Sequence, residues 1–98
     1  MRELPLKSRL HKPLKLEIRY ERSFLLDLKE LEPTVYQQVC QFVFVEFLQI
    51  TQLQDLPELR QMGSRAIFYR FTLDHHFVGI EVTGQIIKFL RILPKPNV

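Results

Sequence analysis

The chain has 98 residues, of which 46% are hydrophobic and 26% charged, and this length and composition predict one globular domain with a modest core. No apolar run approaches the roughly 20 residues of a membrane helix, and the N-terminus has no signal-peptide pattern, so we expect a cytoplasmic protein without membrane contact. Cys40 is the single cysteine, which excludes an intrachain disulfide and a thiolate metal cluster.

The formal net charge of +3 is unevenly distributed. Residues 1–15 carry five basic side chains and one acidic side chain. Residues 16–59 carry three basic and eight acidic side chains, and residues 60–98 carry six basic and two acidic side chains. A basic C-terminal segment attracts polyanions such as RNA or an acidic partner segment. The alternative is an ordinary solvated face.

The first predicted elements are an arm and a strand. Residues 1–15 contain two prolines and scattered charges without a sustained period, which predicts a flexible basic N-terminal arm. The folded domain then spans residues 16–98. Apolar and charged residues alternate from Leu16 to Tyr20, so we expect a first strand there.

Two helices follow. Ser23 is a good N-cap for the first, in which Asp27 would lie near the positive end of the helix dipole. Pro33 would open the second helix, expected from about Thr34 to Ile50. The segment FVFVEFL within it is apolar almost all round and is also compatible with a strand. If it is helical, its outward apolar residues either contact the core or form a partner-binding patch.

The C-terminal half predicts a three-stranded antiparallel meander after a connector over residues 51–64. Apolar residues alternate with others over 66–73 and again over 77–83, with turns at Asp74-His75 and Thr83-Gly84. The third run, Ile86 to Leu93, has apolar residues in both phases, so its inward face cannot be assigned.

Most signatures of chemistry are absent from the sequence. There is no glycine-rich phosphate loop, nucleophile elbow or zinc-binding helix motif. The pair His75-His76 has no third ligand at suitable spacing, so we expect neither a metal nor a cofactor.

The phrases SFLLDLKEL, LPELRQMGS, FYRF, VGIEV and IIKFLRIL, in this order, resemble the RelE/ParE superfamily of bacterial toxin-antitoxin toxins. The resemblance extends from Leu16 to about Leu93. It implies an α+β fold in which two helices pack on a small twisted antiparallel sheet, in the order β-α-α-β-β-β.

The resemblance also implies a function. RelE-type toxins cut mRNA on the ribosome without a metal, whereas ParE-type toxins poison DNA gyrase. Both are neutralised by a cognate antitoxin, and operator DNA is bound through the antitoxin complex. We therefore expect a ribosome-dependent endoribonuclease. The alternatives are a catalytically silent module that still binds an antitoxin, and a gyrase inhibitor.

Carried over residue by residue, the family's basic positions match this chain only in part. Thr72 and Phe77 stand where basic residues are common, and a C-terminal tyrosine is missing. For Arg70 the alternative is a structural pair with Glu81 across the sheet. The candidate catalytic residues are Arg70, Arg91, Lys95 and, as a substitute proton donor, His76; candidate RNA contacts are Arg65 and Lys88; candidate antitoxin contacts are Phe44, Val45 and Phe68.

Overall fold

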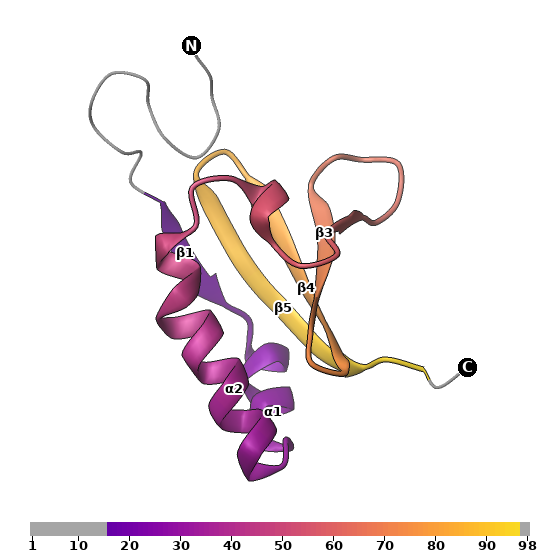
Figure 1. The fold of residues 1–98 in the computed structure, drawn as a ribbon. Helices are drawn as coiled ribbons and strands as arrows, with labels where there is room; N and C mark the ends of the chain where they lie inside the picture. The colour runs from indigo at the N-terminus through magenta and orange to yellow at the C-terminus, as the bar shows by residue number, and fades with distance from the viewer. Residues whose placement is uncertain (1–15, 97–98) are drawn as a thin grey trace.

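The computed structural model describes residues 16–96, which form two helices packed on a five-stranded sheet (Figure 1). The predicted arm, residues 1–15, lies outside the described residues. The elements are β1 (Glu17–Tyr20), α1 (Arg22–Lys29), α2 (Pro33–Phe44), two 3-10 turns (Glu46–Gln49 and Leu53–Asp55), β2 (Arg60–Gln61), β3 (Phe68–Leu73), β4 (His76–Thr83) and β5 (Ile86–Pro94). The predicted α+β class and the order of the main elements are confirmed. Neither helix is long and apolar enough to cross a membrane.

The sheet has the strand order β1-β5-β4-β3-β2 and is mixed rather than wholly antiparallel. β1 runs parallel to β5, with Glu17 opposite Ile86 and Tyr20 opposite Phe89. The predicted meander is present as β3, β4 and β5, and β2 adds a short edge strand that the sequence did not indicate. Alternation within a strand carries no information about the direction of its neighbour, so the parallel pair was not predictable.

A β-bulge explains the apolar residues in both phases of β5. Phe89 lies opposite Ile80, but Arg91 lies opposite Gly79, so Leu90 is an extra residue in β5. The inward phase therefore changes from Phe89 before the bulge to Ile92 after it, and both side chains are buried.

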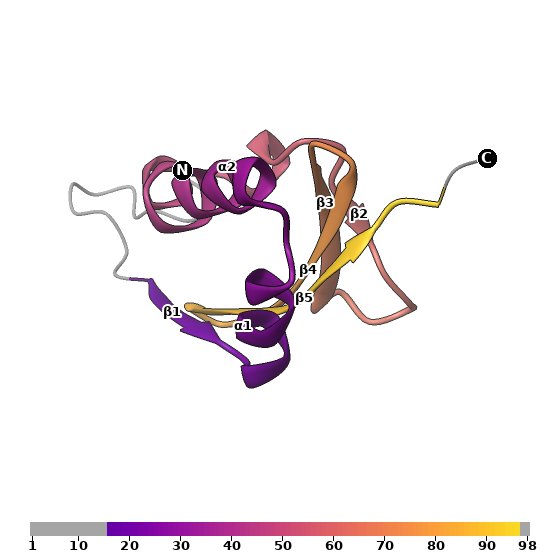
Figure 2. The same ribbon diagram turned by 90° about the horizontal axis from the view of Figure 1, so that it is seen from below.

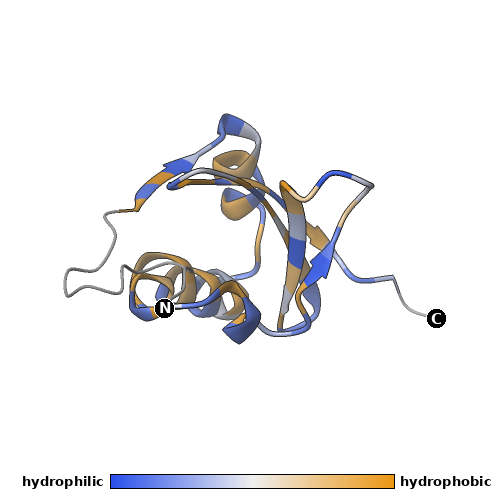
Figure 3. Cartoon of the chain, turned by 90° about the horizontal axis from the view of Figure 1, so that it is seen from above, coloured by the Kyte–Doolittle hydropathy of each residue, from blue (hydrophilic) through white to orange (hydrophobic). Residues whose placement is uncertain are grey.

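The core lies between the sheet and the helices, and hydropathy colouring shows that apolar residues are interspersed with polar ones along the strands and helices that enclose it (Figure 3). Phe89 is its centre: its ring centroid lies 5.0 Å from that of Phe47, 5.3 Å from that of Phe24 and 5.5 Å from that of Tyr20. The alternation predicted for β3 and β4 is present, with Phe71, Val78 and Ile80 facing the core. The buried residues are Phe24, Leu28, Val39, Val43, Phe47, Leu56, Phe71, Val78, Ile80, Ile87, Phe89 and Ile92.

α1 lies against the part of β5 that extends beyond β1 (Figure 2). Ser23, predicted as an N-cap, instead donates a hydrogen bond from Oγ to the carbonyl oxygen of Leu90, at 2.7 Å, and the helix begins after Glu21 without a side-chain cap. Asp27 Oδ2 accepts a 2.8 Å hydrogen bond from the Ile92 amide. Two helix side chains four residues apart thus satisfy backbone groups at an exposed strand edge.

Asp27 also accepts hydrogen bonds from Arg91, 2.7 Å from Nε and 3.1 Å from Nη2. Partial burial opposes ionisation of Asp27, but these bonds, the Ile92 amide and the positive charge of Arg91 outweigh it, so the pKa of this carboxyl lies below its ordinary value. A lowered pKa stabilises the fold above the unfolded value of about 3.9, and this contribution is lost as pH falls through the folded pKa.

We expect Asp27→Ala to lower the free energy of unfolding by about 1 to 3 kcal/mol at neutral pH, chiefly because the half-buried Ile92 amide loses its acceptor. Urea unfolding at several pH values measures the loss. The difference from wild type should shrink as the medium is acidified below pH 4, because the protonated wild-type carboxyl no longer forms the ion pair with Arg91. Glu30→Ala, in the exposed C-cap residue of α1, is the control. A constant difference at every pH would contradict the role of the charge.

α2 is shorter than predicted. It ends at Phe44, and a 3-10 turn over Glu46–Gln49 replaces its expected last turns. The turn allows Phe47 to enter the core, while Phe44 and Val45 are left 37% and 48% exposed. The ambiguous segment FVFVEFL is therefore helical at its start.

Candidate functional site

The face of β2 to β5 that points away from the core carries four of the six basic side chains of residues 60–98. We call it the outer face. Side chains alternate along a strand, so the residues between the buried ones occupy it. It consists of Arg60, Phe68, Arg70, Thr72, Phe77, Gly79, Glu81, Lys88, Arg91 and Leu93.

Phe77 is the centre of a basic cluster on the outer face. The guanidinium carbon of Arg70 lies 4.0 Å from the centroid of the Phe77 ring, and Lys95 Nζ lies 5.8 Å from it. Arg60 is opposite Arg70 in the β2–β3 pair. The aromatic face attracts both cations and holds the planar Arg70 group in one position. We call Arg60, Arg70, Phe77 and Lys95 the Phe77 cluster.

The alternative pair for Arg70 is not formed, because Arg70 lies opposite Gly79 while Glu81 lies opposite Phe68 and Lys88. Arg70 therefore belongs to the Phe77 cluster.

Glu58 supplies one negative charge beside this cluster. Its Oε1 accepts a 3.0 Å hydrogen bond from Thr72 Oγ1 and lies 3.8 Å from Lys95 Nζ. The Thr72 amide also donates to the carbonyl oxygen of Pro57. Thr72, which stands where a basic residue is common, thus anchors the connector to β3 instead.

Arg91 is held by its bidentate pair with Asp27. Its side chain is still 51% exposed, but a partner of opposite charge offsets its field. It lies on the same face as the Phe77 cluster, on the far side of Gly79 from Arg70. Its role in phosphate binding stays a prediction.

His76 belongs to the other face of the sheet. It precedes Phe77 in β4 and has the inward phase of Val78 and Ile80, opposite Leu73 in β3. Its Nδ1 is buried without a hydrogen-bond partner in the described part of the chain. Because neighbouring strand residues point to opposite faces, His76 does not join the Phe77 cluster, and its role as a proton donor stays a prediction.

Arg65 and Lys88 lie apart from the cluster. Arg65 is in the exposed loop between β2 and β3, and Lys88 Nζ forms a 3.3 Å ion pair with Glu21. Lys88 also lies opposite Glu81 in the β4–β5 pair. The RNA contacts of Arg65 and Lys88 stay predictions.

The predicted antitoxin contacts lie on two surfaces. Phe44 and Val45 share a shallow hollow on α2 with Tyr36 and Cys40, and the Phe44 ring lies 5.1 Å from that of Tyr20. We call these four residues of α2 and its C-cap the α2 surface. Phe68, 37% exposed, lies on the outer face instead.

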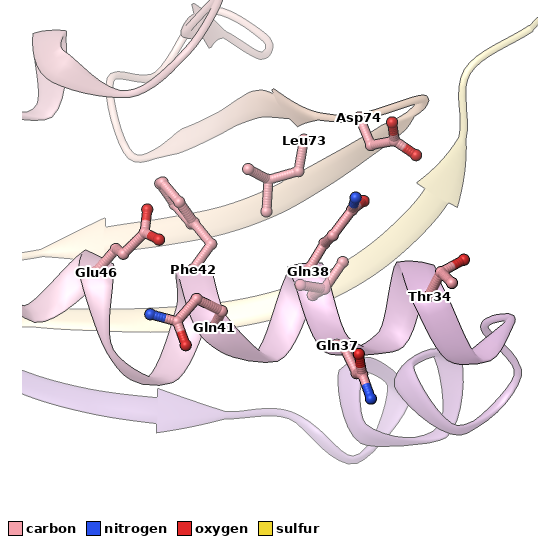
Figure 4. A pocket seen from close by; sticks show the side chains of 9 residues that line it. Thr34, Gln37, Gln38, Gln41, Phe42, Glu46, Leu73 and Asp74 are labelled. Carbon is pink, nitrogen blue, oxygen red and sulfur yellow. The ribbon is translucent and has the colours of Figure 1, made fainter.

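A wider groove, of about 780 Å³, separates α2 from the end of β3 (Figure 4). Its charged lining residues are Glu46 and Asp74, and several glutamines of α2 complete the wall. This groove does not favour an anionic ligand, so its size does not make it the functional site.

No protein-family model and no curated protein sequence matches the chain. Solved structures do. The RelB-RelE antitoxin-toxin complex of Methanococcus jannaschii matches with a TM-score of 0.64 and 22% identity, over 78% of this chain and 88% of that one. The isolated E. coli RelE toxin matches with a TM-score of 0.65 and 12% identity, over 86% of this chain and 88% of that one. The chromosomal ParDE TA system from P. aeruginosa matches with a TM-score of 0.54 and 16% identity, over 83% of this chain and 97% of that one.

Two helices packed on a five-stranded mixed sheet define a small α+β domain, the architecture that these structures share with the chain. The chain has the fold of the RelE toxins. At these identities the likeness establishes the fold, and activity has to be argued from the site.

Proposed function

We propose that the protein is the toxin of a toxin-antitoxin pair and that it inhibits translation by cutting ribosome-bound mRNA without a metal. The Phe77 cluster is the observation that carries this proposal, because it places two cations, Arg70 and Lys95, on one aromatic ring and a third, Arg60, opposite Arg70 on the open face of a RelE-type sheet. Such a face binds phosphates through the cations.

Cleavage by the neighbouring 2′-hydroxyl develops negative charge on the phosphate in the transition state. Arg70 supplies a fixed planar donor for that charge, and Lys95 supplies a second cation on the same ring. Arg91 adds the guanidinium N–H groups that Asp27 leaves free. With His76 on the opposite face, the proton transfers would be made by groups of the RNA or the ribosome.

A catalytically silent module that binds an antitoxin is the second candidate. It is favoured by the ion pair of Arg91 with Asp27 and by Thr72 and Phe77 at positions where the resemblance implies cations. A silent module would keep the surface that binds the antitoxin but would not cleave mRNA.

Inhibition of protein synthesis by the purified protein in a cell-free translation system tests the proposal. We expect amino-acid incorporation to stop while DNA supercoiling by gyrase in a parallel assay continues. Arrest of supercoiling with intact translation would instead favour a gyrase inhibitor. Unaffected translation and supercoiling would favour the silent module.

We further propose that the antitoxin covers the α2 surface, and that operator DNA is bound only through the resulting complex. The α2 surface exposes Tyr36, Phe44 and Val45 to solvent. Exposed apolar area is unfavourable in a free toxin, and a partner that covers it removes this cost.

Phe44→Lys is expected to weaken antitoxin binding at least tenfold, about 1.4 kcal/mol, because a charge would be buried against an apolar partner. Titration calorimetry with the product of the adjacent reading frame measures the affinity. Gln38→Lys makes the same charge on the groove side of the same helix and should leave the affinity unchanged. Equal affinities of wild type and Phe44→Lys would move the interface elsewhere.

A further inference from the structure

β1 is an edge strand, and one side of its backbone is open. Within residues 16–96 it pairs with β5 alone and stands at the end of the strand order (Figure 1). The amides of Glu17 and Glu21 donate hydrogen bonds to carbonyl oxygens on the β5 side. Backbone groups of successive strand residues point to opposite edges, so those of Ile18 and Tyr20 point away from the sheet. Such an open row of donors and acceptors can pair with another strand.

The side chains of β1 and of the residue before it form a self-complementary pattern. Leu16, Ile18 and Tyr20 are partly buried against the core, while Glu17 and Arg19 are exposed on the other side of the strand. When two such strands run antiparallel with Ile18 opposite Ile18, the Glu17 of each strand lies opposite the Arg19 of the other. In the same register Leu16 lies opposite Tyr20, so apolar residues meet apolar ones. Opposite charges and apolar pairs across strands both stabilise a sheet.

Arg19 lacks a complementary neighbour across the sheet in the monomer. It lies opposite Lys88 in β5, which carries the same charge. Lys88 in turn forms its ion pair with Glu21. The acidic partner of Arg19 is Glu17, two residues away on the same strand, at 2.6 Å, and this pair is about half exposed and therefore weak. A second β1 strand would place another carboxylate directly opposite Arg19.

The α2 surface adjoins this edge. The Phe44 ring lies 5.1 Å from the ring of Tyr20 in β1, and Leu48, in the turn after α2, is 63% exposed. A two-fold axis through the Ile18 pair keeps the inner faces of both sheets on the same side. The α2 surfaces of the two copies then lie near the axis on that side, and association would remove exposed apolar area from water.

We propose that the free protein forms a homodimer in which β1 pairs antiparallel with β1 of a second copy, centred on Ile18. The self-complementary charges select a second copy, because a purely acidic or basic peptide would match only one of Glu17 and Arg19. The short ladder gives a weak dimer, with a Kd of about 10 to 100 µM. The dimer goes beyond the proposed toxin activity. Since the second copy and the antitoxin proposed above would both use the α2 surface, they exclude each other.

Sedimentation velocity at low salt, over about 5 to 200 µM protein, tests the dimer. We expect wild type to pass from monomer to dimer with concentration. Glu17→Arg and Arg19→Glu each bring like charges opposite one another and should weaken association at least tenfold. Both side chains are exposed, so circular dichroism should show folded variants. Asp55→Arg makes the same change of charge as Glu17→Arg in the 3-10 turn that leads to β2, and should dimerise as wild type does.

An equimolar mixture of Glu17→Arg and Arg19→Glu gives the sharpest result. Each chain then carries only one sign of charge on β1 and meets the opposite sign in the other chain, so the mixture should associate about as strongly as wild type. The pair within each strand stays broken in both chains. Recovery in the mixture therefore reports contact between two β1 strands.

A wild type that stays monomeric over this range would overturn the proposal, as would single variants that dimerise like wild type or a mixture that does not associate. A monomeric wild type whose antitoxin binding is lost in Glu17→Arg would also overturn it, and would assign the β1 edge to the antitoxin. Sedimentation measures association alone, so its failure leaves the toxin proposal intact. Unaffected translation in the cell-free assay would leave the dimer intact.

Discussion

Replacing Phe89 with alanine is expected to lower the free energy of unfolding by about 3 to 5 kcal/mol. Phe89 is fully buried, and its ring contacts those of Tyr20, Phe24 and Phe47 from β1, α1 and the 3-10 turn after α2. The truncation leaves a cavity where these elements meet and removes three aromatic contacts. A domain of this size has a total stability of about 5 to 15 kcal/mol, so the loss is a large fraction of the free energy of unfolding.

Urea unfolding followed by circular dichroism measures this loss, and Phe89→Leu gives a folded comparison with a smaller loss. Phe68→Ala is the matched control, because Phe68 is the same residue type on the outer face and is 37% exposed. Phe68→Ala should lower the free energy of unfolding by well under half as much as Phe89→Ala. Equal losses at the two positions would contradict the placement of Phe89 at the centre of the core.

Replacing Arg70 with alanine is expected to slow mRNA cleavage by a factor of about 30 to 1,000, corresponding to about 2 to 4 kcal/mol of transition-state stabilisation. The guanidinium is fixed on Phe77, so no reorganisation is needed when charge develops on the phosphate. Arg70→Lys keeps the charge without the planar group and should fall between wild type and alanine.

Single-turnover cleavage on programmed ribosomes provides the rates. Arg22→Ala removes the same charge from the exposed start of α1 and should cleave within about a factor of three of wild type, as expected for an exposed charge outside the site. If Arg70→Ala and Arg22→Ala slow the reaction equally, the effect is one of net charge and not of the Phe77 cluster.

The sequence predicted the parts of the fold that depend on local periodicity. The alternation predicted over 66–73 and 77–83 is present, and Phe71, Val78 and Ile80 from these runs are fully buried. The features that depend on how neighbouring strands pair could not be predicted from the sequence. The bulge at Leu90, the parallel direction of β1 and the strand at Arg60 are properties of pairing, and no single strand encodes them.

The candidate site was predictable to the same degree. Arg70 was found from its place in FYRF, but its contact with the Phe77 ring and its position opposite Gly79 required the register. The Asp27–Arg91 pair joins residues 64 positions apart, and no sequence pattern connects them. The alternation in residues 77–83, extended by one residue, would have placed His76 on the face of Val78 and away from Phe77, because residues two apart share a face.

The most direct test of the toxin proposal is the integrity of mRNA on programmed ribosomes, mapped by primer extension after addition of the purified wild-type protein or of Arg70→Ala. The proposal predicts breaks in the ribosome-bound part of the message with wild type, and their loss or strong reduction with Arg70→Ala. A full-length message and continued protein synthesis with the folded wild-type protein would contradict it, and would leave a toxin fold whose role is binding alone.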